Sequence, residues 1–191
     1  ISAFTFTNVQ AAHTISASFA SNGPFTITAS AGANGTVTPA GATVLACGNS
    51  QAYAITAAPC FHVADVLVDG VSQGAISAFT FTNVQATHTI SATFAINTYT
   101  ITASAGANGT ISPNGVTTLN CAANQSFTIT PNSGYYLSSL IVDGLSVTPA
   151  SPYAFTNVQA NHTIAASFSL DIATIAGTSS ASVLCPTNTC V

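Results

Sequence analysis

Three histidines recur along the chain at nearly constant spacing and are the first residues to test for chemistry. They are His13, His88 and His162. A zinc site needs about four ligands, and no cysteine or carboxylate stands at a fixed ligand spacing beside any of these histidines. We therefore predict that each histidine stands at the start of a strand and has a structural role. The sequence predicts no metal site and no cofactor.

Carboxylate side chains are few, since the chain contains four aspartates and no glutamate. Asp69 and Asp143 each precede a glycine, and Asp-Gly is a preferred pair for a tight type I′ turn. Asp65 has no counterpart near Asp143, so a carboxylate pair for acid–base catalysis or calcium is not repeated. No Gly-x-Ser-x-Gly, His-Glu-x-x-His or phosphate-binding loop is present either. The sequence therefore predicts no enzymatic activity and no catalytic residue.

Cysteines at equivalent places of the chain suggest a disulfide. Cys47 and Cys121 are equivalent in sequence, whereas Cys60 stands where the later repeat has Gly134. The first repeat has therefore gained a potential partner for Cys47. We predict a Cys47–Cys60 disulfide that closes a short loop and contributes ~2–4 kcal/mol.

The remaining three cysteines cannot all pair with one another. They are Cys121, Cys185 and Cys190. Three arrangements are open: a Cys185–Cys190 loop with Cys121 free, a tail folded back on the second repeat, or a bond to a neighbouring molecule.

The segment around each recurrent histidine is written three times. It reads FTFTNVQAAHTISASF at Phe4–Phe19, FTFTNVQATHTISATF at Phe79–Phe94 and YAFTNVQANHTIAASF at Tyr153–Phe168. The interval between copies is longer than the ~20–50 residues of a solenoid turn and indicates a small domain. The resulting parts are a partial repeat over residues 1–22, a first module over 23–96, a second module over 97–169 and a cysteine-containing tail over 170–191.

Apolar residues alternate with hydroxyl-bearing residues inside each repeat, as in FTIT from Phe25 and HTISATF from His88. This alternation is typical of half-buried strands, and the Asn-Gly and Asp-Gly pairs between them favour tight turns. The sequence predicts an all-β fold of tandem, small, antiparallel, sandwich-like modules with about six short strands each. The short joints between modules favour an elongated, semi-rigid rod.

The order of four motifs resembles a known family. TITASAGANGTISP, QSFTITPNSGYY, LIVDG and YAFTNVQANHTIAASF follow one another in the second repeat, and the first repeat keeps this order. The pattern resembles the divergent internalin-B-type B-repeat of bacterial surface and secreted proteins, over residues 1–169. The resemblance implies compact β-rich modules that serve as stalks or adhesive segments, and it supplies no catalytic or ligand-binding residue.

The charge content excludes two classes of partner. The chain has no lysine and no arginine, and its formal net charge is −4. Nucleic acids and anionic membrane surfaces are bound largely through such cations, so we expect neither. Polar residues interrupt every apolar stretch well before the ~20 residues of a spanning helix, so we expect no membrane insertion. Five cysteines in a chain rich in Thr, Ser and Asn favour an extracellular or cell-surface location.

Two features favour self-assembly. Strand edges are normally guarded by lysines or other charges, of which this chain has few. Residues 1–22 carry only the closing strands of a module, and the tail carries a faint copy of a module's opening, so the tail of one molecule could complete the head of the next. The residues expected at this contact are Phe4, Phe6, Ile15, Phe19, Ile175, Val183 and Leu184.

We therefore predict a non-enzymatic extracellular structural protein, the subunit or segment of a bacterial surface filament or stalk, whose main partner is itself. One alternative is an adhesin segment that binds glycan or a host protein through exposed aromatic side chains. Another is a piece of a longer array, in which a preceding half-module completes residues 1–22.

Overall fold

The computed structural model describes residues 3–19 and 22–172, to which the structural statements below refer. Regular structure in these ranges consists of sixteen strands, so the predicted all-β fold of tandem modules is confirmed. None of the described segments forms a helix long and apolar enough to cross a membrane.

The first repeat folds into eight strands that form two sheets. A five-stranded sheet has the order β3-β1-β8-β5-β6, and a three-stranded sheet has the order β2-β4-β7. The strands are β1 (Phe25–Ala31), β2 (Gly35–Thr38), β3 (Gly41–Leu45), β4 (Gln51–Ala57), β5 (Phe61–Val68), β6 (Val71–Ser72), β7 (Ala78–Phe81) and β8 (His88–Ile96).

The second repeat has the same topology. Its five-stranded sheet has the order β11-β9-β16-β13-β14, and its three-stranded sheet has the order β10-β12-β15. The strands are β9 (Thr98–Ala105), β10 (Gly109–Ser112), β11 (Gly115–Asn120), β12 (Gln125–Pro131), β13 (Tyr135–Val142), β14 (Leu145–Val147), β15 (Tyr153–Phe155) and β16 (His162–Leu170).

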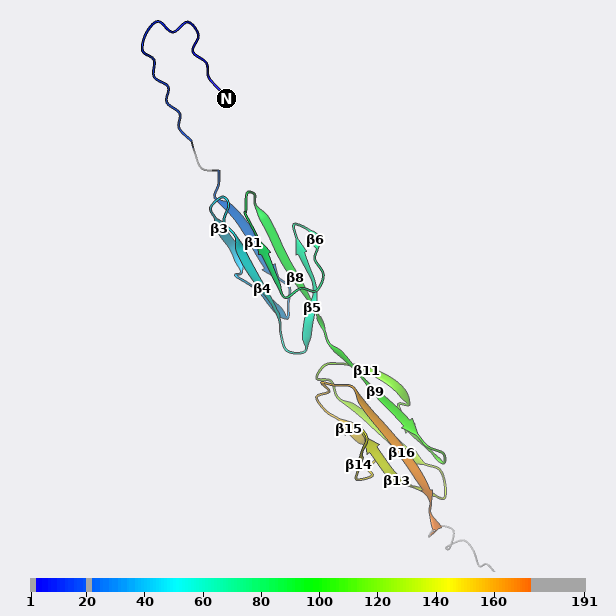
Figure 1. The fold of residues 1–191 in the computed structure, drawn as a ribbon. Coiled ribbons are helices and arrows are strands. Elements are labelled where there is room, and N and C mark those ends of the chain that lie inside the picture. The colour runs from blue at the N-terminus through cyan, green and yellow to red at the C-terminus, as the bar shows by residue number, and fades with distance from the viewer. Residues whose placement is uncertain (1–2, 20–21, 173–191) are drawn as a thin grey trace, which may run out of the picture. The chain divides into compact units, whose positions relative to one another are not determined.

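The first and last strands of each repeat lie side by side and run parallel (Figure 1). Ile27 of β1 pairs with His88 of β8, and Ile101 of β9 pairs with His162 of β16. The modules are mostly antiparallel, as expected, but each adds this parallel pair and has eight strands where about six were expected. Strands β6 and β14 have only two and three residues, too few to show an alternation. The parallel pair joins the two ends of a repeat, a contact that no local pattern reveals.

The cores of the two modules are built from the same positions. In β4, for example, Tyr53 and Ile55 are buried while Ala52 and Ala54 are exposed. Burying a large apolar side chain stabilises a fold by ~1.5–3 kcal/mol. Ten buried residues of the first module recur at equivalent positions of the second: Ile27 and Ile101, Ala29 and Ala103, Val37 and Ile111, Tyr53 and Phe127, Ile55 and Ile129, Val66 and Leu140, Phe81 and Phe155, Val84 and Val158, Ile90 and Ile164, Ala92 and Ala166.

Both sheets of the second module contribute to one apolar cluster, in which β9, β13 and β16 face β10, β12 and β15. This arrangement is a small two-layered sandwich. Phe168 of β16 packs against the cluster, and its ring covers Gly109 at the start of β10.

We expect Gly109→Ala to destabilise the second module by ~1–3 kcal/mol, because a Cβ at this position would overlap the ring of Phe168. The control is Gly106→Ala, whose Cβ would only make an ordinary contact of 3.5 Å with the carbonyl oxygen of Ala166. Urea unfolding followed by circular dichroism measures both variants. Equal stability of the two variants would contradict the predicted packing of Phe168.

Candidate functional site

The strongest polar arrangement in the first module lies at the Asp69-Gly70 turn between β5 and β6. Asp69 and Gly70 have φ of +48° and +79°, as a two-residue type I′ turn requires, so the predicted turn is confirmed. The Asp69 side chain also reaches the start of β8. Its Oδ2 lies 2.7 Å from Nδ1 of His88, and its Oδ1 accepts the backbone N–H of Thr89 over 2.7 Å. The N–H of Asp69 donates in turn to the carbonyl oxygen of Thr89 over 3.0 Å.

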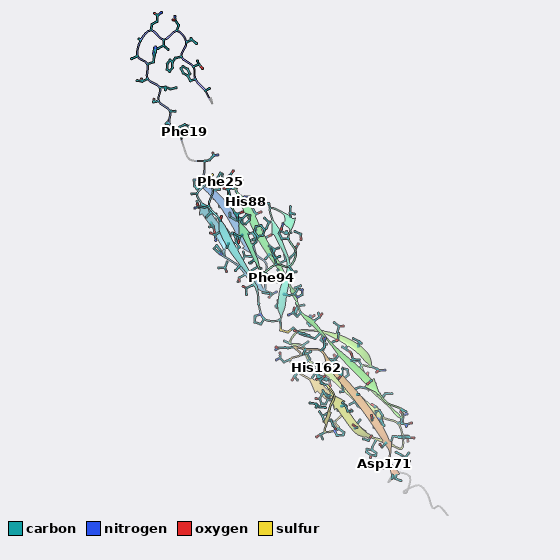
Figure 2. The ribbon with its side chains drawn as sticks, viewed as in Figure 1. Phe19, Phe25, His88, Phe94, His162 and Asp171 are labelled. Atoms are coloured by element: carbon teal, nitrogen blue, oxygen red, sulfur yellow. A yellow bond between two sulfur atoms is a disulfide. The ribbon has the colours of Figure 1, made fainter. Side chains whose placement is uncertain are left out.

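The second module repeats this arrangement atom for atom. Asp143 Oδ2 lies 2.7 Å from Nδ1 of His162, and Asp143 Oδ1 accepts the N–H of Thr163 over 2.7 Å. We call the arrangement the aspartate clamp, which comprises Asp69, His88 and Thr89 in the first module and Asp143, His162 and Thr163 in the second. Each clamp ties a hairpin turn to the start of its module's last strand, and Figure 2 labels both histidines.

The clamp favours the ionised aspartate. The hydrogen bond from His88 lowers the pKa of Asp69 most, and the N–H of Thr89 lowers it further. For Asp143 the largest effect is burial, which raises the pKa, but the hydrogen bonds from His162 and Thr163 outweigh it and the net pKa is lowered.

Each clamp brings together one carboxylate and one imidazole. No cluster of three or more His, Cys, Asp or Glu side chains suited to a metal occurs in the described ranges. The hydrogen bonds of each clamp join a hairpin turn to the start of a strand. His88 and His162 do stand at strand starts, as predicted, but their pairing with Asp69 and Asp143 was missed. The signal that could have revealed it is the equal spacing of aspartate and histidine in both repeats.

The cysteines pair differently from the prediction. The disulfide joins Cys60 to Cys121, with a Cα–Cα distance of 5.4 Å, and Cys47 is exposed and free among the described cysteines. The predicted Cys47–Cys60 pair is therefore wrong, and none of the three arrangements left open for Cys121 gave it Cys60 as a partner. The reason is spatial, because residues 57–62 group into one compact unit with the residues from Phe94 onward.

Residues 3–19 have no strand, although their sequence is a copy of β7 and β8 (Figure 1). The side chains of Phe4, Phe6, Ile15 and Phe19 are exposed, and that of Phe19 reaches 94%. His13 stacks on Phe6 with ring centroids 5.1 Å apart, much as His88 lies against Phe81. The other predicted contact residues, Ile175, Val183 and Leu184, lie outside the described residues, as do Cys185 and Cys190.

Two β-sandwich modules of one topology, each fastened by an aspartate clamp, define a tandem array of structural repeats. Residues 99–172 match the family described as the divergent InlB B-repeat domain. The second repeat is therefore a divergent InlB B-repeat domain, as its motifs suggested, and the first repeat shares its strand order and core positions. No curated protein and no solved structure was found to match the chain.

We expect Asp143→Asn to lower the stability of the second module near neutral pH by up to ~1 kcal/mol, since solvent screens this partly exposed pair. The Asn-Gly pair still favours the type I′ turn, so the change tests the carboxylate alone. Because the folded pKa of Asp143 lies below 3.8, its contribution is fully present above that value and is lost as the pH falls through the folded pKa. Urea unfolding at about pH 6 and about pH 2.5 should show a smaller difference between variant and wild type at the lower pH. The same difference at both values would contradict the prediction.

We expect Cys60→Ser and Cys121→Ser each to destabilise the fold by ~4 kcal/mol, from the chain entropy of a cross-link across a sequence separation of 61 residues. Cys47→Ser is the matched control and should change stability by less than ~0.5 kcal/mol, because its side chain is exposed and free. Unfolding in urea without reductant measures the three variants, and mass mapping of peptides identifies the bond. A peptide that joins Cys47 to Cys60 would refute this assignment.

Proposed function

We propose that the chain is a non-enzymatic, extracellular or cell-surface structural protein of bacteria, a segment of a filament or stalk built from tandem B-repeat modules. The observation that carries the proposal is the state of residues 4–19. They match residues 79–94 except at two positions, where Ala12 stands for Thr87 and Ser18 for Thr93. The segment at residues 79–94 closes a module, whereas residues 4–19 pair with no strand in the described ranges.

The apolar residues of this segment are those that a module buries. Phe6, Val9 and Ile15 are 40%, 58% and 66% exposed. Their counterparts Phe81, Val84 and Ile90 are 6%, 1% and 0% exposed. Burial of three such side chains would stabilise a contact by several kcal/mol, at ~1.5–3 kcal/mol each. The segment thus has the sequence of the two closing strands of a module and could pair with the opening strands of another module.

The segment cannot close the module that follows it. If residues 13–19 lay beside β1 in the parallel register of β8, His13 would pair with Ile27. The chain would then have to return along the whole strand within residues 20–24. A parallel connection needs about a dozen residues or more, so the segment must serve a module on another molecule or elsewhere in a longer chain.

The edges of the described sheets also favour assembly. Strand β6 and its counterpart β14 lie at sheet edges, where Val71 and Leu145 are 63% and 71% exposed. No lysine or arginine guards these edges. The adhesin alternative lacks a comparable observation, because the aromatic rings of the two modules lie mostly in or against the cores, with Tyr136 the large exposed one.

Within this proposal, the head segment of one molecule pairs with the tail of the next. The tail sequence Ala173-Thr-Ile175-Ala follows the pattern of Tyr99-Thr-Ile101-Thr at the opening of a module. Such a contact is heterologous and would extend as an open filament. The aspartate clamp also favours pairing of the head segment with another module. His13 is the counterpart of the clamp histidine His88, but no aspartate stands before it at the clamp spacing.

The test compares Ile15→Asn with Thr14→Asn in the full chain. Both side chains are exposed in residues 3–19, but only the counterpart of Ile15 is buried in a complete module. We expect filaments in negative-stain electron microscopy for wild type and Thr14→Asn. Ile15→Asn should weaken association ~100-fold or more, the equivalent of ~3 kcal/mol for a lost buried isoleucine.

A second variant lacks residues 1–22 and should sediment as a monomer while keeping the circular dichroism of both modules. Filaments formed by this deletion variant would refute the strand-closing role of the segment. Dispersed wild-type molecules at all concentrations would refute the filament itself.

A further inference from the structure

The turns that follow β3 and β11 have one geometry and carry equivalent cysteines. In both turns, the residue after the cysteine has a positive φ and donates its N–H over 2.8 Å to the carbonyl oxygen of a buried valine of the same module. The surroundings of the two sulfur atoms nevertheless differ. Cys121 is 9% exposed and bonded to Cys60, whereas Cys47 is exposed and free.

A loop of the preceding repeat covers Cys121. The N–H of Cys121 donates to the carbonyl oxygen of Asn97 over 2.8 Å, and the N–H of Asn97 donates to the carbonyl oxygen of Cys60 over 2.8 Å. His62 Nδ1 lies 2.8 Å from Oδ1 of the same asparagine. Backbone, side chain and disulfide together hold the β4–β5 loop against the turn.

In the first module the corresponding place is a hollow. It has a volume of about 210 Å³ and is lined by residues 22–24 and 44–47. Residues 22–24 precede β1 just as Asn97 precedes β9. The hollow thus contains the counterparts of Asn97 and Cys121, but not the counterpart of the loop that carries Cys60.

The backbone conformation of Cys60 indicates that a cysteine stands there because of its disulfide. Cys60 has a φ of +68°, in a region that favours glycine, and the equivalent Gly134 has a φ of +78° in the same type of loop. Glycine is the residue that this backbone prefers. A cysteine there is explained by the bond that it forms with the following module.

We infer that the hollow beside Cys47 receives the cysteine-bearing β4–β5 loop of another B-repeat module, and that Cys47 forms with it the disulfide that Cys121 forms with Cys60. The inference rests on one part of the proposed function, in which residues 4–19 close a B-repeat module. The partner here is a whole module with its own β4–β5 loop, because residues 173–191 contain no counterpart of that loop. The spacing from Phe19 to Cys47 differs by a single position from the spacing between Phe94 and Cys121. The closing segment and the acceptor cysteine therefore lie nearly equally far apart at both joints.

The bond forms by thiol–disulfide exchange with a small extracellular disulfide such as oxidised glutathione. One protein thiolate attacks this disulfide and releases one thiol, and the second protein thiolate then displaces the other thiol. The two protein thiols are oxidised to one disulfide, the small disulfide is reduced to two thiols, and the two protons stay with these.

The test extends the full chain with a copy of residues 20–78 placed directly before Phe4, in which the copied Cys47 is serine. Residues 4–19 then become the closing strands of the added module, and its copied Cys60 comes to the joint before Cys47. After oxidation with glutathione, we expect mass mapping to find Cys47 joined to the copied Cys60 and alkylation of Cys47 to be lost. The control carries glycine at the copied Cys60, as Gly134 does, and should leave Cys47 open to alkylation.

Two readouts separate this inference from the proposed function. Hydrogen exchange of the amides of residues 13–19 reports whether the segment closes the added module, and peptide mapping reports the disulfide. Protected amides with a free Cys47 would overturn the disulfide and leave strand closure intact. A bond from Cys47 to Cys185 or Cys190 would overturn the choice of partner. A bond from Cys47 to the copied Cys60, found together with unprotected amides in residues 13–19, would support the disulfide and refute strand closure.

Discussion

The parallel pairing of the first and last strands is the constraint on which each module depends. It places β8 between β1 and β5, and β16 between β9 and β13, at the centre of the larger sheet. The central strand carries Ile90 and Ala92 in one module and Ile164 and Ala166 in the other, all buried. A module therefore remains open along its middle until its final residues arrive, and a segment with this sequence has little structure of its own to adopt.

The aspartate clamp assists the same closure, though with a smaller energy. A partly exposed ion pair contributes up to ~1 kcal/mol, whereas burial of one isoleucine of the central strand contributes ~1.5–3 kcal/mol. The main effect of the clamp is to favour one register of the last strand in the sheet. A shift of one residue would turn Ile90 toward the solvent face. The two hydrogen bonds that Asp69 accepts from His88 and from the N–H of Thr89 therefore favour the correct alignment of the strand.

Local patterns in the sequence were sufficient for the longer strands, the Asp-Gly turns and the repeated core. Alternation locates residues such as Ile27 and Tyr53, because a strand next to one core buries every second side chain. Contacts between distant segments left no such pattern. The parallel pair joins β1 to β8, the clamp joins the β5–β6 turn to β8, and the disulfide joins Cys60 to a residue of the next repeat. Repeats aligned in sequence suggested the wrong partner for Cys60, since alignment assigns the β4–β5 loop to its own module.

Sequence repeat and packing unit are therefore out of phase in this chain. The repeat in sequence runs from β1 to β8, but residues 57–62 group with residues that follow Phe94. The second packing unit thus includes a loop from the repeat before it. The hydrogen bond from the N–H of Asn97 to the carbonyl oxygen of Cys60 has a counterpart from Asp171 to Gly134. The equivalent loop of the second module has the same conformation with Gly134 in place of Cys60. The conformation of the loop therefore does not depend on the cysteine, which adds only the covalent bond. In the second module the core is complete once β16 has paired with β9, but the turn after β11 is covered by the β4–β5 loop of the preceding repeat.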